Sequence, residues 1–288
     1  ILKKRADSNG VIYTATAGEE PAVIKELCDH ADALGFEIIA AGKGKNNPLQ
    51  LDANPQTVAE KVPNIGITAR QVTSFIDGSK TMVEMACAAN AVGLVPDVRG
   101  MHGAKATLDE LTNIFRLREE GGILSQKGVV DYVVGGGVDP GVFVVITTGN
   151  KRLLSDLNYL KVGRGPNYIL YNPYHLWFID TPLSVVRAVL KKEPTIVPKG
   201  RPTAAVAAVA KRSLKAGETL DGIGAYCVYG TIEKWEITER EMLLPYGLTE
   251  DTKMVRDVGK GELLTYDDVM FENSVLLELR RQQDDLFK

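Results

Sequence analysis

The stretch FEIIAAGKGKNNP, Phe36 to Pro48, decides the fold. Its first seven residues form a short apolar run after Gly35, which predicts a buried strand. Acidic residues and a proline in Gly18-Glu-Glu-Pro21 predict a helix start, and that helix runs through Ala22–Leu34. VTSFID (72–77) is predicted as a further strand, leading through Gly78 into an apolar helix at Thr81–Leu94. This strand–loop–helix alternation predicts an α/β chain with an α+β substrate domain.

The remaining segments are less regular. ILKKRADSNG, at the start, predicts the end of a helix stopping at Asn9-Gly10, and VIYTAT (11–16) predicts a strand. One amphipathic helix is expected around Asp109–Glu119. DYVVGGG and GVFVVITT (131–148) predict paired strands with a turn near Asp139-Pro140-Gly141. PLSVVRAVL predicts an apolar helix, and PTIVPKGRP (194–202) predicts a linker.

Bulk composition excludes several classes of protein. The 288 residues carry a net charge of −3, so no overall electrostatic attraction to nucleic acid exists. No apolar run approaches the roughly 18 residues of a membrane span. The three cysteines, Cys28, Cys87 and Cys227, are far apart, which is typical of free thiols in a cytoplasmic protein. No close Cys/His pairs exist, so no metal site is expected.

Two lysines follow the predicted buried strand. Lys43 and Lys45 flank Gly44 in a predicted loop, at the strand end where α/β proteins place ligand groups. Ammonium groups bind phosphate or carboxylate, and glycine lets the backbone approach a ligand. Asn46 adds an amide suited to a hydroxyl group. The alternative is a solvated loop with surface lysines.

Charge also interrupts the apolar helix. Asp77 precedes it and can cap it, while Lys80 and Glu84 stand four residues apart on one face, close enough to pair. These three residues are the candidate catalytic set: a lysine held by carboxylates can protonate or polarise a carbonyl oxygen. The alternative is a buried structural ion pair.

Two further residues are candidates for substrate binding. His175 lies in the aromatic setting NPYHLW, where a histidine is more often part of the hydrogen-bonded core than a catalyst. Arg187 interrupts its apolar helix and would either bind a phosphate or pair with an acid such as Asp180. His102, in GMHG, is a weaker candidate, and His30 is expected to be structural or at the surface.

An internal repeat lies near the C-terminus. Arg212-Ser-Leu-Lys-Ala-Gly-Glu-Thr-Leu220 matches Arg256-Asp-Val-Gly-Lys-Gly-Glu-Leu-Leu264 as R-x-(L/V)-x-x-G-E-x-L. Each copy predicts strand, glycine turn and strand, so the two copies can pair as halves of a β-rich module.

This repeat, with AVAKRSLKAGETLDGIGAYCVYG and GKGELLTYDDV, resembles the SAF domain. Together with AAGKGKNNP, SFIDGSKTMVEM, GVVDYVVG and NPYHLWF, nearly the whole chain resembles SAF-containing oxidoreductases related to homoserine dehydrogenases and to deoxyxylulose-phosphate-reductoisomerase-like proteins. The resemblance implies three parts: residues 1–35 as the trailing edge of a Rossmann domain, 36–195 as the substrate domain, and 200–288 as the SAF-like domain.

The resemblance also implies a function. It implies an NAD- or NADP-dependent oxidoreductase for a small anionic carbonyl or hydroxy substrate, phosphorylated or carboxylated, with 1-deoxyxylulose 5-phosphate suggested by the reductoisomerase-like members. Homoserine dehydrogenases use a lysine–aspartate set, which implies the same type of role for Lys80. The glycine-rich cofactor loop is expected upstream of Ile1, since no GxGxxG stands between strand and helix here. A homo-oligomer is implied, and no nucleic-acid or membrane partner. The alternative is a non-catalytic module that binds an anionic sugar or serves assembly.

Overall fold

The computed structural model describes residues 1–63 and 66–287. The chain forms two compact units. We call Leu2–Asn47 with Cys87–Gly200 the sheet unit, and Pro48–Ala86 with Arg201–Lys288 the repeat unit. Each unit is described by itself. In the described part of the chain, no helix combines the length and the apolar character that crossing a membrane requires.

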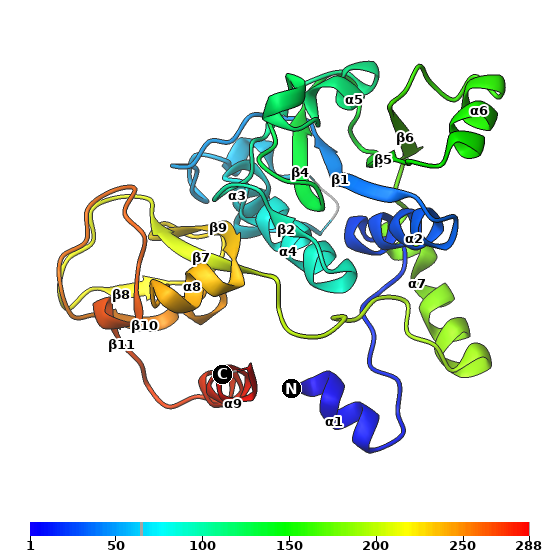
Figure 1. The fold of residues 1–288 in the computed structure, drawn as a ribbon. Coiled ribbons are helices and arrows are strands. Elements are labelled where there is room, and N and C mark those ends of the chain that lie inside the picture. The colour runs from blue at the N-terminus through cyan, green and yellow to red at the C-terminus, as the bar shows by residue number, and fades with distance from the viewer. Residues whose placement is uncertain (64–65, 288) are drawn as a thin grey trace. The chain divides into compact units, whose positions relative to one another are not determined.

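A mixed sheet organises the sheet unit (Figure 1). Its strands follow the order β2-β4-β1-β5-β6, with β3 also paired to β4. β1 is parallel to β4 on one side and antiparallel to β5 on the other. The strands span β1 Glu37–Lys45, β2 Val95–Pro96, β3 Ala104–Lys105, β4 Val129–Val134, β5 Val142–Thr147 and β6 Asn167–Asn172. β1 is therefore the central strand, and its C-terminal end lies at the middle of one sheet edge.

The two faces of β1 differ in character. Ala40, in register with Val129 and Val145, belongs to an apolar core completed by Leu111 and Phe115. Residues of the opposite parity, Ala41, Lys43 and Lys45, point to the other face. Helix α2 (Glu20–Ala33) packs against β1 and β5. The sheet unit also contains α1 Leu2–Ser8, α5 Leu111–Ile114, α6 Lys151–Tyr159, and α7 Trp177–Val186 continued by a π-helical turn at Arg187–Lys191.

The repeat unit is built from short strands and two small apolar cores. Helix α3 (Ala69–Ile76) packs Val72 and Ile76 against Ala53 and Val58. The larger core gathers residues of 206–277, including Leu214 and Leu264. The other elements are β7 Ala204–Ala210, β8 Thr219–Asp221, β9 Val228–Lys234, α8 Trp235–Arg240, β10 Glu250–Met254, β11 Val269–Met270 and α9 Val275–Phe287. Helix α4 (Ser79–Val92) begins in the repeat unit and ends in the sheet unit.

The internal repeat pairs as its sequence predicts. Leu214 and Val258, equivalent in the two copies, exchange backbone hydrogen bonds of 2.9 and 3.0 Å. The N–H of Gly217 donates to the Met254 carbonyl, and the N–H of Gly261 donates to that of Ala210, both at 2.8 Å. Gly217 and Gly261 have φ of 85° and 84°, a conformation that glycine adopts at little cost. The turn glycine of each copy thus donates to an equivalent carbonyl beside the other copy, so the two copies are related by approximate twofold symmetry.

Four local predictions are wrong. VTSFID is not a strand: residues 69–76 form α3, because Thr68 and Gln71 make a capping box that starts a helix. VIYTAT forms only an isolated bridge between Ala15 and Ile196. The strands within 131–148 are not paired with each other, since β1 lies between them. The helix expected at 109–119 is reduced to one turn, α5, with 3₁₀ turns at 108–110 and 118–120.

Candidate functional site

The lysines of GKGK are the last residues of β1, and not of a loop as the sequence predicts. Pairing with β4 continues through Lys45, opposite Val134, and this extends the strand. Lys43 and Lys45 are each 8% exposed. Ammonium groups are almost never this buried unless they are paired or have a function. Asn46, the next residue, is exposed.

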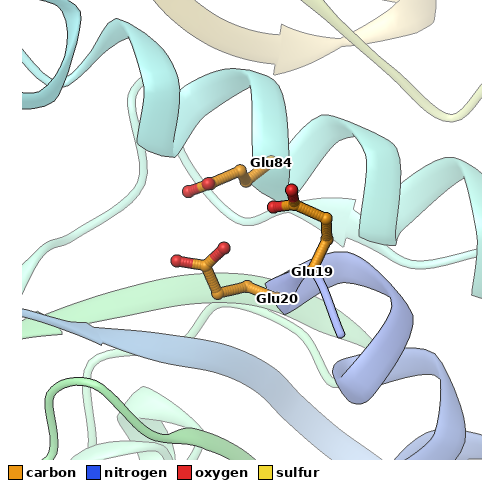
Figure 2. A group of neighbouring side chains, drawn as sticks. All are labelled: Glu19, Glu20 and Glu84. Atoms are coloured by element: carbon orange, nitrogen blue, oxygen red, sulfur yellow. The ribbon is translucent and has the colours of Figure 1, made fainter. Parts of the chain in front are cut away.

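Glu20 is the partner of Lys43. Its Oε1 lies 2.5 Å from Lys43 Nζ, and its side chain is 4% exposed. Figure 2 shows Glu20 in the first turn of α2, where the helix dipole favours a carboxylate. Glu20 was not a site candidate on sequence grounds, because an acid at a helix start is explained by the helix alone.

His175 joins the same group. Its Nε2 lies 3.4 Å from Glu20 Oε1, and its Nδ1 lies 2.9 Å from the Pro140 carbonyl oxygen. The side chain is 19% exposed, so the ring is fixed on two sides but still reachable. The structure therefore brings together Lys43 and His175, two candidates that are 132 positions apart in the sequence.

The β4–β5 loop adds a second carboxylate. A Cβ at Gly44 would lie 2.2 Å from the backbone nitrogen of Asp139, and Gly44 N–H donates to the Gly141 carbonyl at 2.9 Å. Only glycine allows this close approach. Burial raises the pKa of Asp139, while the nearby charges of Lys43 and His175 oppose that rise and Glu20 adds to it. Two carboxyl groups, two lysines and one histidine thus share one edge of the sheet.

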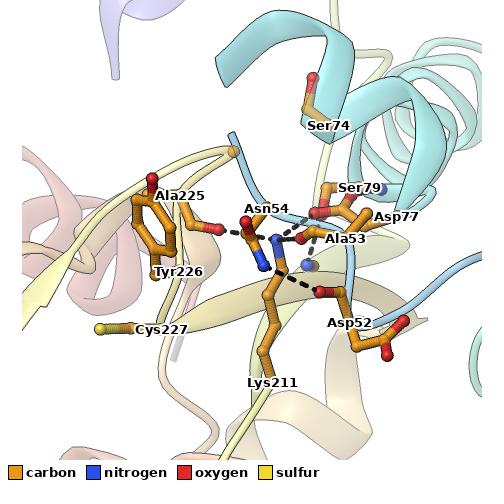
Figure 3. A network of polar contacts seen from close by, with 12 residues as sticks. Asp52, Ala53, Asn54, Ser74, Asp77, Ser79, Lys211, Ala225, Tyr226 and Cys227 are labelled. Atoms are coloured by element: carbon orange, nitrogen blue, oxygen red, sulfur yellow. Dashed lines mark hydrogen bonds and ion pairs between the residues drawn. The ribbon is translucent and has the colours of Figure 1, made fainter. Parts of the chain in front are cut away.

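Asp77, a predicted catalytic residue, lies in the repeat unit in a buried network (Figure 3). Its Oδ1 accepts from Ser79 N–H at 2.8 Å, and its Oδ2 lies 2.7 Å from Lys211 Nζ. Lys211 also donates to the carbonyl oxygens of Ala53 and Ala225 at 2.7 and 2.8 Å. Asp77 and Lys211 are 1% and 4% exposed. The Asp77 carboxylate therefore caps α4 and neutralises a buried lysine.

Lys80 and Glu84 pair on α4 as their spacing predicts. The Lys80 side chain is 35% exposed and that of Glu84 8% exposed. Lys80 Nζ also lies 5.3 Å from the centroid of the Phe75 ring, within range of a cation–π contact. Figure 2 shows Glu84 projecting from α4. Lys80 is thus held by a carboxylate and an aromatic ring, yet remains partly accessible.

Arg187 lies in a different place. It pairs with Glu26 at 2.9 Å, and not with Asp180. Both line a groove of about 880 Å³ between α2, the end of α4 and residues 193–199, and Cys28 also lines this groove. Burial raises the pKa of that thiol to about 12. Arg187 therefore faces a groove with charges of both signs.

His102 is bound between two acids of the sheet unit. Its Nδ1 lies 2.7 Å from Asp131 Oδ2, and its Nε2 lies 3.4 Å from Asp97 Oδ2. The hydrogen bond that the His102 ring donates to Asp131 is the main reason why the pKa of His102 is raised. Asp131 is fully buried and also accepts from the backbone N–H groups of His102, Gly103 and Tyr132. This cluster ties the glycine-rich loop before β3 to β4.

Comparison with known families decides the class of protein. Residues 18–181 match the family described as "Oxidoreductase DRL, catalytic domain", more than half of the chain. The chain belongs to this family. The DRL catalytic domain includes Glu20, Lys43, Lys80, Asp139 and His175. No curated protein matches the chain.

In this DRL protein, the starts of α2 and α4 do not fit the pyrophosphate of a nicotinamide dinucleotide, the usual hydride donor of oxidoreductases. α2 begins at Glu19 and Glu20, whose negative charges oppose a phosphate. The start of α4 is occupied by the Asp77 carboxylate. Neither helix start is therefore assigned to the dinucleotide.

Proposed function

We propose that the protein is an NAD- or NADP-dependent oxidoreductase for a small carbonyl or hydroxy compound that carries a phosphate or carboxylate. The observation that carries this proposal is the pair of buried lysines at the end of β1, Lys43 and Lys45, inside an oxidoreductase catalytic domain. Ammonium groups bind phosphate or carboxylate, and this strand end offers two of them, one of which, Lys43, is held in place by Glu20. 1-Deoxyxylulose 5-phosphate is the first substrate to test.

The proposed roles follow from charge and exposure. Lys43 and Lys45 bind the anionic group of the substrate, and Asn46, exposed beside them, binds a hydroxyl group. Lys80 polarises the carbonyl oxygen, and Glu84 holds its ammonium group in place. Asp77 fixes the start of the helix that carries Lys80. Arg187 is proposed as a further contact for a phosphate group. A bound nicotinamide would supply the hydride.

The proposal is tested by turnover. The protein is mixed with NADPH or NADH, and substrate-dependent loss of absorbance is screened over sugar phosphates and small carboxylated aldehydes. We expect turnover with at least one phosphorylated or carboxylated compound. Binding of neither dinucleotide would contradict the proposal and favour a non-catalytic sugar-binding module.

Two variants assign the residues. Lys80→Met should lower kcat by about 100-fold or more with unchanged dinucleotide affinity, because a lost electrostatic contact to the transition state costs this much. Lys43→Met should raise KM for anionic substrates more than for a neutral analogue. Lys105→Met, at an exposed lysine of the same sheet, is the control and should change neither constant.

A further inference from the structure

We infer that His175 and Glu20 hold one exchangeable proton between them, and that His175 Nε2 delivers it to the substrate oxygen. This inference rests on the proposed function for its catalytic role. The proton-holding pair itself follows from geometry within the sheet unit.

The first step is the tautomer of the ring. A carbonyl oxygen accepts hydrogen bonds and cannot donate them. Because Nδ1 of His175 lies 2.9 Å from the Pro140 carbonyl oxygen, Nδ1 carries a hydrogen. The neutral ring carries only one N–H group, so the contact of Nδ1 also determines the state of Nε2. In the neutral ring, Nε2 therefore carries a lone pair.

The second step concerns the group that Nε2 faces. Glu20 Oε1 lies 3.4 Å away and belongs to a carboxyl group that is 4% exposed. A lone pair facing a buried carboxylate oxygen is repulsive, whereas an Nε2–H group facing it is attractive. A proton on Nε2 thus converts repulsion into a charge-assisted contact. Glu20 is a positioning residue, which acts on the substrate only through His175.

Other charges limit how tightly this proton is held. Lys43 pairs with Glu20 Oε1 at 2.5 Å and so weakens the attraction of Glu20 for a positive ring. Lys45 and the carboxyl group of Asp139, in the β4–β5 loop, lie in the same group of charges. Glu20 favours a proton on the His175 ring, and Lys43 weakens that effect. A proton that is held with intermediate strength can be transferred, as acid–base catalysis requires.

The proton balance is simple. When the carbonyl carbon gains a hydride, which a reduced nicotinamide would supply, the oxygen keeps the former π pair as a negative charge. The Nε2–H bond breaks, an O–H bond forms, and the imidazolium becomes neutral imidazole. Solvent then returns a proton to Nε2, since the His175 side chain is 19% exposed. In the oxidative direction, the same nitrogen takes the hydroxyl proton.

The protonation state of each ring nitrogen of His175 can be measured by NMR. The chain has three histidines, His30, His102 and His175, so ¹⁵N-histidine labelling gives three imidazoles, and His175→Asn identifies one of them. Long-range ¹H–¹⁵N correlation spectra at high pH should show His175 protonated at Nδ1 only. A neutral ring protonated at Nε2 would overturn the inference.

Glu20 is tested in the same spectra at one fixed pH near 6.5. Glu20→Gln should lower the doubly protonated fraction of His175 by at least twofold, because it removes the facing charge. Glu20→Asp should keep most of that fraction. Glu37→Gln, at an exposed carboxylate at the other end of β1, is the control and should leave the fraction unchanged. An unchanged fraction in Glu20→Gln would remove Glu20 from the pair.

Measurements of turnover test the catalytic role separately. His175→Asn can keep the contact to the Pro140 carbonyl but lacks Nε2, so kcat should fall about 100-fold with KM changed less than threefold. A normal kcat would overturn proton delivery by His175. Absence of turnover in the unsubstituted protein would instead contradict the proposed function, while the spectra would still decide the proton-holding pair.

Discussion

Lys211 Nζ lies 2.7 Å from Oδ2 of Asp77 in the interior of the repeat unit, where the two side chains are 3% and 0% exposed. Removal of one member of a buried pair leaves the other charge without compensation. Lys211→Met should therefore destabilise the repeat unit by about 3–5 kcal/mol. Urea unfolding followed by Trp235 fluorescence in a Trp177→Phe background reports on this unit alone, since the chain has two tryptophans.

The matched control is Lys215→Met, which removes an exposed pair with Asp257 and should change little. An equal effect of the two substitutions would show that burial of the Asp77 pair carries no special energetic weight.

Gly44 is expected to be intolerant of any side chain. Alanine would place Cβ 2.2 Å from the backbone nitrogen of Asp139, and a backbone atom cannot move aside like the end of a side chain. Gly44→Ala should cost about 1–3 kcal/mol, measured as a lower thermal midpoint. Gly149→Ala, with no atom within 4 Å of the new Cβ, should leave the midpoint unchanged. A stable Gly44→Ala protein would mean that the β4–β5 loop is not fixed against β1.

His102 should make stability depend on pH. Its pKa is raised in the folded state, chiefly by the hydrogen bond to Asp131. The folded protein thus binds this proton more tightly than the unfolded chain, whose histidine titrates near about 6.5. The stabilisation is complete below about pH 6.5 and is lost as pH rises through the folded-state pKa. The stability difference between wild type and His102→Gln should be larger at pH 6 than at pH 9, and an equal difference would contradict this.

The cysteines should differ in reactivity. Burial raises the pKa of Cys28 to about 12 and that of Cys227 to about 11, whereas Cys87 is exposed. A maleimide at pH 7 should label one thiol rapidly in the native protein and three after denaturation. Cys87→Ser should abolish the rapid phase. Rapid labelling of Cys28 would mean that the groove beside α2 opens readily.

Local sequence signals predict much of the fold. The acids and Pro21 place the start of α2, and Gly35 follows its end, because helix ends depend on neighbouring residues. The repeat predicts its own pairing for a different reason, because two copies of one strand–turn–strand pattern can complete each other. VTSFID misled because its apolar, β-branched composition fits a strand, while the deciding signal was the capping box of Thr68 and Gln71 just before it.

The candidate site could be predicted only in part. Buried charge pointed to Lys43 and to the Lys80–Glu84 pair, since apolar surroundings make charge conspicuous. The sequence did not single out Glu20, Asp139 or Lys211, because their contacts depend on which segments are neighbours in space. No local sequence pattern predicts, for example, that β1 lies between β4 and β5.

The exchange of partners between the repeat copies has a consequence for folding kinetics. Gly217 needs the Met254 carbonyl and Gly261 needs that of Ala210, so neither copy can complete its turn before the other arrives. Equivalent positions such as Leu214 and Val258 must close a loop of about 44 residues, an entropic cost that precedes any gain from the contacts. A nascent chain ending between the copies would hold an unpaired first half, and the module should form in one cooperative step once the second half is synthesised.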